Sequence, residues 1–438
     1  MTPAAAAQAR LALLAQNLDA SQWFAPPALE RNRAVQLAAL LQHHAAQCDW
    51  VADRLRSIGA APGQLAASPQ SFAQFPVTTR RDVQQAGAAF HARAVPVAHR
   101  PVAEKKTSGS TGEPVAVRRT ALNHLFWLAT TLREHQWHGR DPAGTLAVVR
   151  ANLVEPFSAP SWGSPVADLF TTGPVFGVPA STDTRALIAW LRQHRPHYLL
   201  IYPSIWRAAL DHLQGDMRGL ESLRQIRTIG ETVSDELRRR TREEAGLPLA
   251  DTYSSEEAGT IAIQCPQGGL YHTMAEGLIV EVLAGDGRAC APGEVGRVVV
   301  TDLLNFATPL IRYEIGDHAE ACLSCACGRH LPALRKILGR ERNMVRLPGG
   351  ASHWPLTGFH DFAQVAPVLQ YQLVQKSLQR IEVRLVVQGG PPTPGQEAAL
   401  RRIITRALLH PFELSFVYFD SYLPRARSGK FEEFICEI

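Results

Sequence analysis

The chain has 438 residues and a mass of 48.0 kDa, a length that predicts two or three domains. Hydrophobic residues make up 46% and charged residues 19%, which is typical of a globular protein and excludes a disordered or coiled-coil chain. The formal net charge is +5, and the basic residues are scattered rather than clustered, so we expect no nucleic-acid binding. The longest apolar runs are far shorter than the roughly 20 residues that span a bilayer, and the N-terminus lacks the pattern of a signal peptide. We therefore expect a cytoplasmic protein without a membrane partner.

Hydrophobic periodicity predicts helices over residues 1–60 and alternating strands and helices from about 100 to 260. The clearest elements of the alternating region are Leu146–Val149, Ala186–Gln193, Tyr198–Tyr202 and Ser234–Ala245. Strand patterns dominate from 270 to 340, and the tail then shows the pattern of strand, strand, helix and strand. The elements expected there are Gly277–Leu283, Gly296–Thr301, Val368–Val374, Ile381–Val387, Gln396–Leu409 and Leu414–Phe419. This order predicts an α/β fold with a large N-terminal domain over 1–340, which includes a β-rich subdomain, and a small α+β domain over 341–438.

One segment, Thr107–Pro114, has the composition of an anion-binding loop. Its glycines and hydroxyl residues would let backbone N–H groups and side-chain hydroxyls surround a phosphate. It is not a Walker A loop, because no lysine follows the second glycine. Taken alone, the segment is equally well interpreted as a surface turn rich in serine and glycine.

Six further motifs follow this loop in the chain. They are Tyr202–Trp206, Gly230-Glu231, Asp251–Gly259, Arg312–Asp317, Gly339-Arg340 and Ser428–Lys430. From about residue 75, where Pro76–Arg80 matches another family segment, the chain resembles the adenylate-forming superfamily in its phenylacetate-CoA ligase-like branch. The resemblance implies an adenylate-forming fold with a mobile C-terminal lid domain. It also implies ATP-dependent activation of a carboxylic acid, aromatic or arylacetic, to an acyl-adenylate and its transfer to a thiol, with coenzyme A as the expected acceptor.

The resemblance assigns roles to individual residues. ATP binding falls to Thr107, Ser108, Gly109, Ser110, Thr111, Gly112, Gly230, Glu231, Asp251, Thr252, Tyr253, Asp317 and Arg340. The catalytic residues are Lys430 and Glu257, and Glu257 would hold Mg²⁺ because a hard cation prefers carboxylate oxygen. Glu256 stands where the family usually has Thr or Ser, so either carboxylate or both could hold the metal. The acid pocket would be formed by Trp162, Gly163, Ser204 and Ile205, although aromatic and apolar residues at such positions could equally belong to the core.

A lysine eight residues from the C-terminus is ordinarily a solvated tail charge. This chain, however, has only five lysines, at positions 105, 106, 336, 376 and 430, and uses arginine nearly everywhere else. A lysine delivers a compact positive charge to the negative charge that develops on an α-phosphate and a carboxylate. The scarcity of lysine and the order of the motifs favour a catalytic Lys430.

The cysteines form a second pattern. Cys322, Cys325 and Cys327 lie within six positions, and Cys265 and His272 are seven residues apart. Three cysteines and a histidine make a soft tetrahedral set suited to structural zinc. Members of the branch that the chain resembles carry zinc from similar positions, which makes Cys265, His272, Cys325 and Cys327 the ligands and Cys322 a spare. The alternative is a group of ordinary buried thiols.

Several alternatives stay open. The hinge segment Gly339–Asn343 has Arg342 where the family usually has aspartate, so a carrier protein or another nucleophile could replace coenzyme A. The chain could instead be a ligand-binding homologue that has lost catalysis, or a zinc-dependent hydrolase, which would need an open metal position. The oligomeric state, a homodimer included, is also open.

Overall fold

The structure is a computed structural model that describes residues 2–107, 115–322, 324–340, 343–350, 352–353, 362–423, 425 and 431–438. Its contacts divide the chain into two compact units. Unit 1 comprises Met1–Ala143, Ser161–Gly173 and Asp251–Ile337, and unit 2 comprises Gly144–Pro160, Pro174–Ala250 and Leu338–Ile438. No helix in the described part of the chain is long and apolar enough to cross a membrane.

The N-terminal part of unit 1 is helical, as the sequence predicts. Its helices are α1 (Pro3–Ser21), α2 (Pro26–Gln47), α3 (Asp49–Ser57), α4 (Pro62–Leu65), α5 (Pro69–Phe72) and α6 (Arg80–Ala86), followed by the 3₁₀ turns η1 (Gly87–Phe90) and η2 (Val97–His99). Proline begins four of these helices, where its missing N–H has no intrahelical partner to lose. Leucines at 37, 40 and 41 form the buried face of α2 and pack against α3, α4 and α5.

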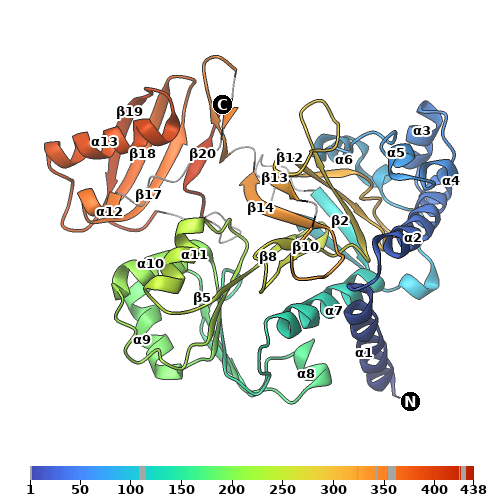
Figure 1. Cartoon of the computed structure of the whole chain (residues 1–438), viewed down its shortest axis with the longest axis horizontal. Helices are drawn as coiled ribbons and strands as arrows, with labels where there is room; N and C mark the ends of the chain where they lie inside the picture. The colour runs from blue at the N-terminus through green and yellow to red at the C-terminus, as the bar shows by residue number, and fades with distance from the viewer. Residues whose placement is uncertain are drawn as a thin grey trace. The chain divides into compact units, whose positions relative to one another are not determined.

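A hairpin brings the two ends of the Ser/Gly-rich segment together. Strands β1 (Val102–Thr107) and β2 (Val115–Thr120) pair antiparallel with Thr107 opposite Val115. Helix α7 (Ala121–Trp137) follows at once, because the Thr120 side chain caps it through a capping box with Asn123. Helix α7 lies beside α1 in Figure 1 and buries Phe126 and Leu132 in the core of unit 1.

The rest of unit 1 is mainly antiparallel sheet, the β-rich region predicted from the sequence. Its strands are β8 (Leu249–Ser255), β9 (Gly259–Gln264), β10 (Tyr271–Thr273), β11 (Leu278–Leu283), β12 (Val295–Asp302), β13 (Tyr313–Cys322) and β14 (Ala333–Arg340), with the short helix α8 (Val166–Leu169) beside them. The strand order is β11-β12-β13-β14-β10-β9-β8. Every residue of β9 is buried, and apart from Gln264 at its end the strand consists of apolar and small residues.

Unit 2 contains a parallel sheet with helical crossovers. Its strands β3 (Leu146–Arg150), β5 (Val175–Pro179), β6 (Tyr198–Ile201) and β7 (Gln225–Ile229) run parallel in the order β7-β6-β3-β5, and β4 (Phe157–Ala159) adds antiparallel to β5. Helices α9 (Thr184–His194), α10 (Pro203–Leu213) and α11 (Asp235–Glu243) pack against this sheet around the fully buried Trp206 (Figure 1). Ser234 caps α11, as its position before the amphipathic stretch predicts.

The C-terminal part of unit 2 has a hydrophobic core of its own, formed entirely by residues between 345 and 436. Its elements are β15 (Val345–Arg346), β16 (Ser352–His353), α12 (Phe362–Val365), β17 (Val368–Gln375), β18 (Arg380–Val387), α13 (Pro394–Leu408), β19 (Glu413–Phe419) and β20 (Phe434–Cys436). The sheet order is β19-β18-β17-β20, and α12 and α13 pack against it (Figure 1). The sequence predicts β17, β18, α13 and β19 but misses the three-residue β20, which is too short to show a periodicity.

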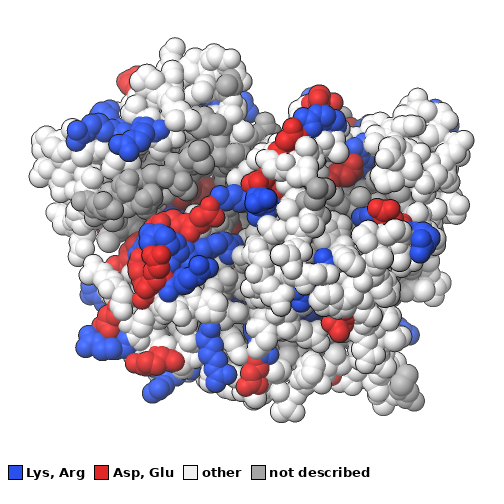
Figure 2. Space-filling view, in the orientation of Figure 1, with Lys and Arg blue, Asp and Glu red and all other residues white. Residues whose placement is uncertain are grey.

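Charged side chains on the face shown in Figure 2 are mixed in sign. Acidic and basic groups alternate over α10 and α11, where Arg239 pairs with Glu236 and Glu243, and Arg240 pairs with Glu244 and Asp211. Such mixed pairs give the surface little net field.

Candidate active site

Two predicted ATP-binding residues from separate motifs meet in unit 1. The hydroxyl of Tyr253, on β8, donates a hydrogen bond of 2.9 Å to Oδ2 of Asp317, on β13. Tyr253 is buried and Asp317 half-buried, so this hydrogen bond fixes the orientation of the Asp317 carboxylate. Such a pair could bind a nucleotide, with the aromatic ring beside the base and the carboxylate accepting hydrogen bonds from the ribose hydroxyls.

Strand β8 also supplies Asp251 and Thr252. The Tyr271 hydroxyl donates to Asp251 Oδ2 at 2.6 Å, and the Asp251 N–H donates to the Gln264 side chain at 3.0 Å, so Asp251 is part of a buried structural network. The Thr252 hydroxyl is buried and has no hydrogen-bond partner in the described part of the chain. A buried hydroxyl without a hydrogen-bond partner lowers the stability of the fold. Such a hydroxyl next to Tyr253 is expected in a site where a polar ligand supplies the partner.

The acidic turn between β8 and β9 is surrounded by cations. Glu257 is nearly buried and its Oε1 lies 3.9 Å from Nη1 of Arg80, at the start of α6. Glu256 is largely exposed, with its Oε2 3.9 Å from Nζ of Lys105. The Arg119 guanidinium lies against the same turn, and a Cβ added at Gly259 would be 2.7 Å from its Nη2. The two carboxylates therefore have different environments, and the buried one is Glu257.

Part of the predicted site lies outside the described residues. Thr107 ends β1, but Ser108, Gly109, Ser110, Thr111 and Gly112 are not described, nor is Lys430 with its neighbours Ser428 and Gly429. Arg342 of the hinge is also outside them.

Unit 2 contributes a network centred on Glu231, which follows β7. Gly230 has a positive φ of 80°, which lets the chain turn sharply at the end of the strand. The Glu231 carboxylate accepts hydrogen bonds from the N–H groups of Ser204 and Phe431, at 2.9 and 2.7 Å. Arg425 donates to Glu231 at 3.2 Å and to the Ser204 hydroxyl at 2.9 Å. This network brings together two predicted site residues and two residues of the C-terminal segment.

The remaining predicted residues are divided between the units. Ile205 packs in the hydrophobic core of unit 2, and Arg340 is the last residue of β14 in the same unit. Trp162 belongs to unit 1, where its ring lies 5.3 Å from that of His135 and packs against the core. Gly163 follows it with a positive φ of 77°.

The predicted metal ligands are gathered in unit 1. The ligand atoms of Cys265, His272, Cys325 and Cys327 all lie within 4.8 Å of one another. Cys265 follows β9, His272 is on β10, and the two other cysteines lie between β13 and β14. A Cβ added at Gly268 would lie 2.4 Å from the Cys325 sulfur. The loop after Cys265 therefore approaches the loop of Cys325 and Cys327 so closely that only glycine fits at position 268.

Hydrogen bonding and burial suit this cluster to a soft cation. His272 Nδ1 lies 3.0 Å from the Leu331 carbonyl oxygen, so it carries the proton and directs the Nε2 lone pair toward the sulfurs, with Cys327 at 3.2 Å. Burial lowers the pKa of His272, which keeps the ring neutral. Burial raises the pKa of Cys325 to about 12, whereas hydrogen bonds led by that from the Arg329 N–H outweigh burial and lower the pKa of Cys327. A neutral imidazole beside a stabilised thiolate is the donor set that zinc prefers.

The loop that follows these cysteines is packed against the N-terminal helices. The Arg329 guanidinium lies 4.5 Å from the ring centroid of Trp137 and 5.2 Å from that of Trp23. Arg329 Nε also donates to the Gln22 side chain at 2.8 Å. The cysteine cluster is thus connected to the junction between α1 and α2.

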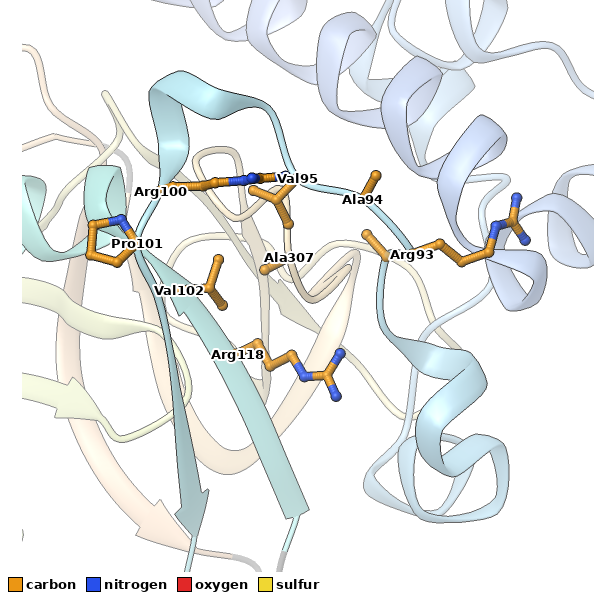
Figure 3. A pocket seen from close by; sticks show the side chains of 9 residues that line it. Arg93, Ala94, Val95, Arg100, Pro101, Val102, Arg118 and Ala307 are labelled. Carbon is orange, nitrogen blue, oxygen red and sulfur yellow. The ribbon is translucent and has the colours of Figure 1, made fainter.

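A separate open cavity of about 770 Å³ lies in unit 1 (Figure 3). It is lined by Ala92, Arg93, Ala94, Val95, Arg100, Pro101, Val102, Arg118 and Ala307, none of them a predicted site residue. Two of its three arginines are already paired, Arg93 with Asp49 and Arg118 with Glu104. The cavity therefore adds nothing to the candidate site.

Comparisons with known proteins show which proteins this chain resembles. The family model described as AMP-binding enzyme matches residues 91–306. The phenylacetate-coenzyme A ligase of Escherichia coli (strain K12) is 26% identical over 290 residues, which cover 63% of this chain and 63% of that protein. By these matches the chain is similar to members of the adenylate-forming superfamily. The phenylacetate-coenzyme A ligase of Pseudomonas putida is 23% identical over 346 residues, 76% of this chain and 75% of that protein.

A solved structure of 2-hydroxyisobutyryl-CoA ligase, in its postadenylation state with an acyl-AMP, has the same fold. Its TM-score to this structure is 0.71, at 18% identity, over 95% of this chain and 91% of that chain. At this identity the likeness shows the fold alone. It confirms the adenylate-forming fold predicted from the sequence.

The sequence analysis assigned no role to two arginines that the structure places beside predicted site residues. Arg80 is the last residue of the Pro76–Arg80 segment, which matches the family, and the structure places it beside Glu257. Arg425 lies in the arginine-containing stretch before Lys430, and the structure pairs it with Glu231. Arg80 lies in a matched segment and Arg425 lies just before one, but only the tertiary structure shows which carboxylates they face.

Proposed function

We propose that the protein uses ATP to convert a carboxylic acid into an acyl-adenylate and then transfers the acyl group to the thiol of coenzyme A. The observation that carries this proposal is the hydrogen bond between Tyr253 and Asp317, which joins two nucleotide motifs in one unit. The buried hydroxyl of Thr252, which has no hydrogen-bond partner among the described residues, supports it, because a nucleotide would give that group a partner.

In the first step an oxygen of the substrate carboxylate attacks the α-phosphorus of ATP in line, and the bond to the bridging oxygen of pyrophosphate breaks. Tyr253 would lie along the adenine, and Asp317 would accept hydrogen bonds from the ribose hydroxyls. We assign Glu257 as the residue that would hold Mg²⁺. The bound cation would neutralise charge on the phosphates. The Thr107–Gly112 segment would surround the leaving phosphates, and Lys430 would stabilise the charge that develops at the reacting oxygens.

We propose a boundary near residue 340 between a large domain and a small mobile domain that carries Lys430. The separate hydrophobic core within residues 345–436 supports this boundary, since a region with its own core can move as a body. Movement of the small domain would separate the adenylation step from the transfer to the thiol. We expect the protein to act in the cytoplasm.

The substrate class we propose is an aromatic or arylacetic acid. Two of the relatives carry the name phenylacetate-coenzyme A ligase, and an aromatic side chain such as Trp162 would suit an acid of this class. Coenzyme A is the proposed acceptor, and a carrier protein is the alternative, because Arg342 departs from the family hinge.

We also propose that Cys265, His272, Cys325 and Cys327 hold one structural zinc ion. Their close ligand atoms and the fixed His272 tautomer support this assignment. Four protein ligands close the coordination shell, which argues against a zinc-dependent hydrolase.

ATP–pyrophosphate exchange tests the function directly. We expect exchange with at least one member of a panel of aryl, arylacetic, fatty and amino acids, and thioester formation when coenzyme A is added to that acid. A folded protein that shows no exchange with any acid would instead be a ligand-binding homologue. Exchange without thioester formation would favour a carrier protein as acceptor. Gel filtration during purification would distinguish a monomer from a homodimer.

A further inference from the structure

The chain segment that follows the cysteine cluster binds the junction between α1 and α2. The N–H of Arg329 donates to the Cys327 sulfur at 3.5 Å, a contact that orients the thiolate from outside the cluster. The side chain of the same residue donates from Nε to Oε1 of Gln22 at 2.8 Å. The next residue, His330, donates its N–H to the Gln22 carbonyl oxygen at 2.9 Å. Two consecutive residues beside a predicted metal ligand therefore bind one residue of the junction.

Gln22 directly follows α1 and is almost completely buried. Its Nε2 donates to the backbone carbonyl and to the carboxylate of Asp19, at 2.8 and 2.7 Å. Both ends of the buried amide are therefore hydrogen-bonded, and Arg329 supplies the donor for its oxygen. A buried acceptor that loses its donor lowers the stability of the surrounding contacts, so the position of Arg329 affects how firmly the junction is fixed.

Two tryptophan rings contact the same arginine. The Arg329 guanidinium lies 4.5 Å from the ring centroid of Trp137 on α7 and 5.2 Å from that of Trp23 in the junction, and an aromatic face attracts a cation at such distances. Trp137 also packs edge-on against the His272 ring, with the centroids 5.6 Å apart. A Cβ added at Gly328 would lie 3.8 Å from the Trp23 ring. A predicted metal ligand and the junction thus contact the same group of side chains.

The segment continues with contacts to both partners. His330 Nδ1 lies 3.1 Å from the carbonyl oxygen of Phe24, in the junction. The Leu331 carbonyl oxygen accepts the His272 Nδ1 proton at 3.0 Å, and the Leu331 side chain packs with Leu29 of α2. The segment therefore contacts the cluster and the junction at each of its successive residues.

The four predicted ligands differ in how the fold holds them. His272 lies on β10, and Cys265 directly follows β9, the strand that pairs with β10. Cys325 and Cys327 lie in the connection between β13 and β14, outside any helix or strand. Thiols attract one another and an imidazole only weakly, whereas a shared metal ion would join this connection firmly to the sheet. The position of the segment after Cys327 should therefore depend on metal binding.

The body of α1 has other anchors. Leu11 and Leu18 belong to the core of unit 1, and Arg133 of α7 donates to the Leu18 carbonyl oxygen. The Ser21 hydroxyl donates to Glu276 at 2.7 Å. These contacts do not involve the cysteine cluster. Loss of the metal should therefore open the junction locally while α1 and the core stay in place.

We propose that metal binding at Cys265, His272, Cys325 and Cys327 fixes the junction between α1 and α2, with Arg329 as the connecting residue. This inference rests on the zinc site of the proposed function. It adds a regulatory property that a purely local zinc site would not have, because the packing of the N-terminal helices would follow the metal content of the protein.

Hydrogen exchange in peptides that cover residues 19–30 tests this inference without an activity assay. We expect these amides to exchange roughly tenfold faster after a chelator has removed the ion, and to return to the original rate when Zn²⁺ is added, while β12 in the same unit does not change. The Arg329→Met variant should keep its zinc and show the same faster exchange, because it removes the contacts with Gln22 and the tryptophans but no ligand. The matched control is Arg335→Met, which removes a partly exposed pair with Glu320 and should leave this exchange unchanged.

Exchange at residues 19–30 that does not respond to removal of bound zinc, or a wild-type rate in zinc-loaded Arg329→Met, would overturn the inference. If chelation also accelerates exchange in β12, the protein unfolds globally, and zinc-loaded Arg329→Met alone decides the outcome. A protein that contains no zinc and binds none when it is added would refute the zinc site and this inference together. Acid activation is tested separately by pyrophosphate exchange, so the two proposals can fail independently.

Discussion

Arg312 is joined to Glu281 by two hydrogen bonds, from Nε at 3.0 Å and from Nη2 at 2.9 Å. Its Nη1 also donates to the backbone carbonyls of Ala73 and Phe75, both at 2.6 Å. Arg312 has a positive φ of 46° and directly precedes β13, the strand that carries Asp317. The first residue of the Arg312–Asp317 motif is therefore a buried structural anchor that fixes the start of the strand.

Replacing Arg312 by methionine should lower the free energy of unfolding by about 3–5 kcal/mol, because Glu281 would stay partly buried without its cation and two carbonyls would lose their donor. Urea denaturation measures this loss. The matched control is Arg288→Met, which removes an exposed bidentate pair with Glu294 and should change stability little. Similar losses in both variants would mean that Arg312 has no special structural role.

Glu257→Gln should lower adenylation far more than Glu256→Gln. Glu257 is nearly buried and faces Arg80, whereas Glu256 is 72% exposed in its side chain. The amide keeps the shape of the side chain but removes the charge that a hard cation requires. Pyrophosphate exchange as a function of Mg²⁺ concentration should show a higher Mg²⁺ requirement only for Glu257→Gln. An equal or larger effect at Glu256 would transfer the metal role to that residue.

Cys325→Ser and Cys327→Ser should lower zinc content and the melting temperature together, because the free energy of binding a structural metal contributes to folding. The Cys322→Ser variant is the control, since Cys322 lies close in sequence but outside the four-residue cluster. Elemental analysis and thermal melting of the three variants test the site. If the wild-type protein binds no zinc and all three variants melt at the wild-type temperature, the cysteines are ordinary buried thiols and the zinc site is refuted.

The pH dependence of stability should reveal Asp302. Burial raises its pKa to about 6, although Arg119 and hydrogen bonds from Asn123 and Leu304 favour the charged form. Between about pH 4 and 6 the unfolded chain loses this proton while the folded chain keeps it, so the contribution of Asp302 to stability falls as pH rises. Compared with the wild type, Asp302→Asn should therefore gain about 2–3 kcal/mol from pH 4 to 7. A difference that does not vary with pH would show that the carboxyl has the same pKa in the folded and unfolded chains.

The sequence predicted the features that local patterns encode. Helices such as α9 and α11 follow from apolar periodicity and capping residues, and the gathering of Cys265, His272, Cys325 and Cys327 follows from cysteine spacing combined with the family resemblance. The pairing of Glu231 with Arg425 depends on a contact between residues 194 positions apart, which no local pattern records. The burial that separates Glu257 from Glu256 has the same origin, because it depends on how α6 and the β1–β2 hairpin meet the turn.

The last prediction concerns Lys430, which the structure does not describe. If Lys430 stabilises the transition state of adenylation only, Lys430→Ala should lower pyrophosphate exchange by about 10²–10³, the usual cost of losing one well-placed charge. Thioester formation from synthetic acyl-adenylate should be largely preserved, because that half-reaction does not use this charge. We expect no global unfolding of this variant, so the melting temperature should not change.

The matched control for Lys430→Ala is Lys376→Ala, since Lys376 pairs with Glu437 at 2.8 Å and should affect neither half-reaction. Rapid-quench measurement of acyl-adenylate formation, with thioester formation measured separately, gives both rates on the same preparation. If both half-reactions fall together in a protein that melts normally, or if neither falls, Lys430 is not the adenylation lysine. Lys105 and Lys106, which lie on β1 next to the Ser/Gly-rich segment, would then be the residues to substitute.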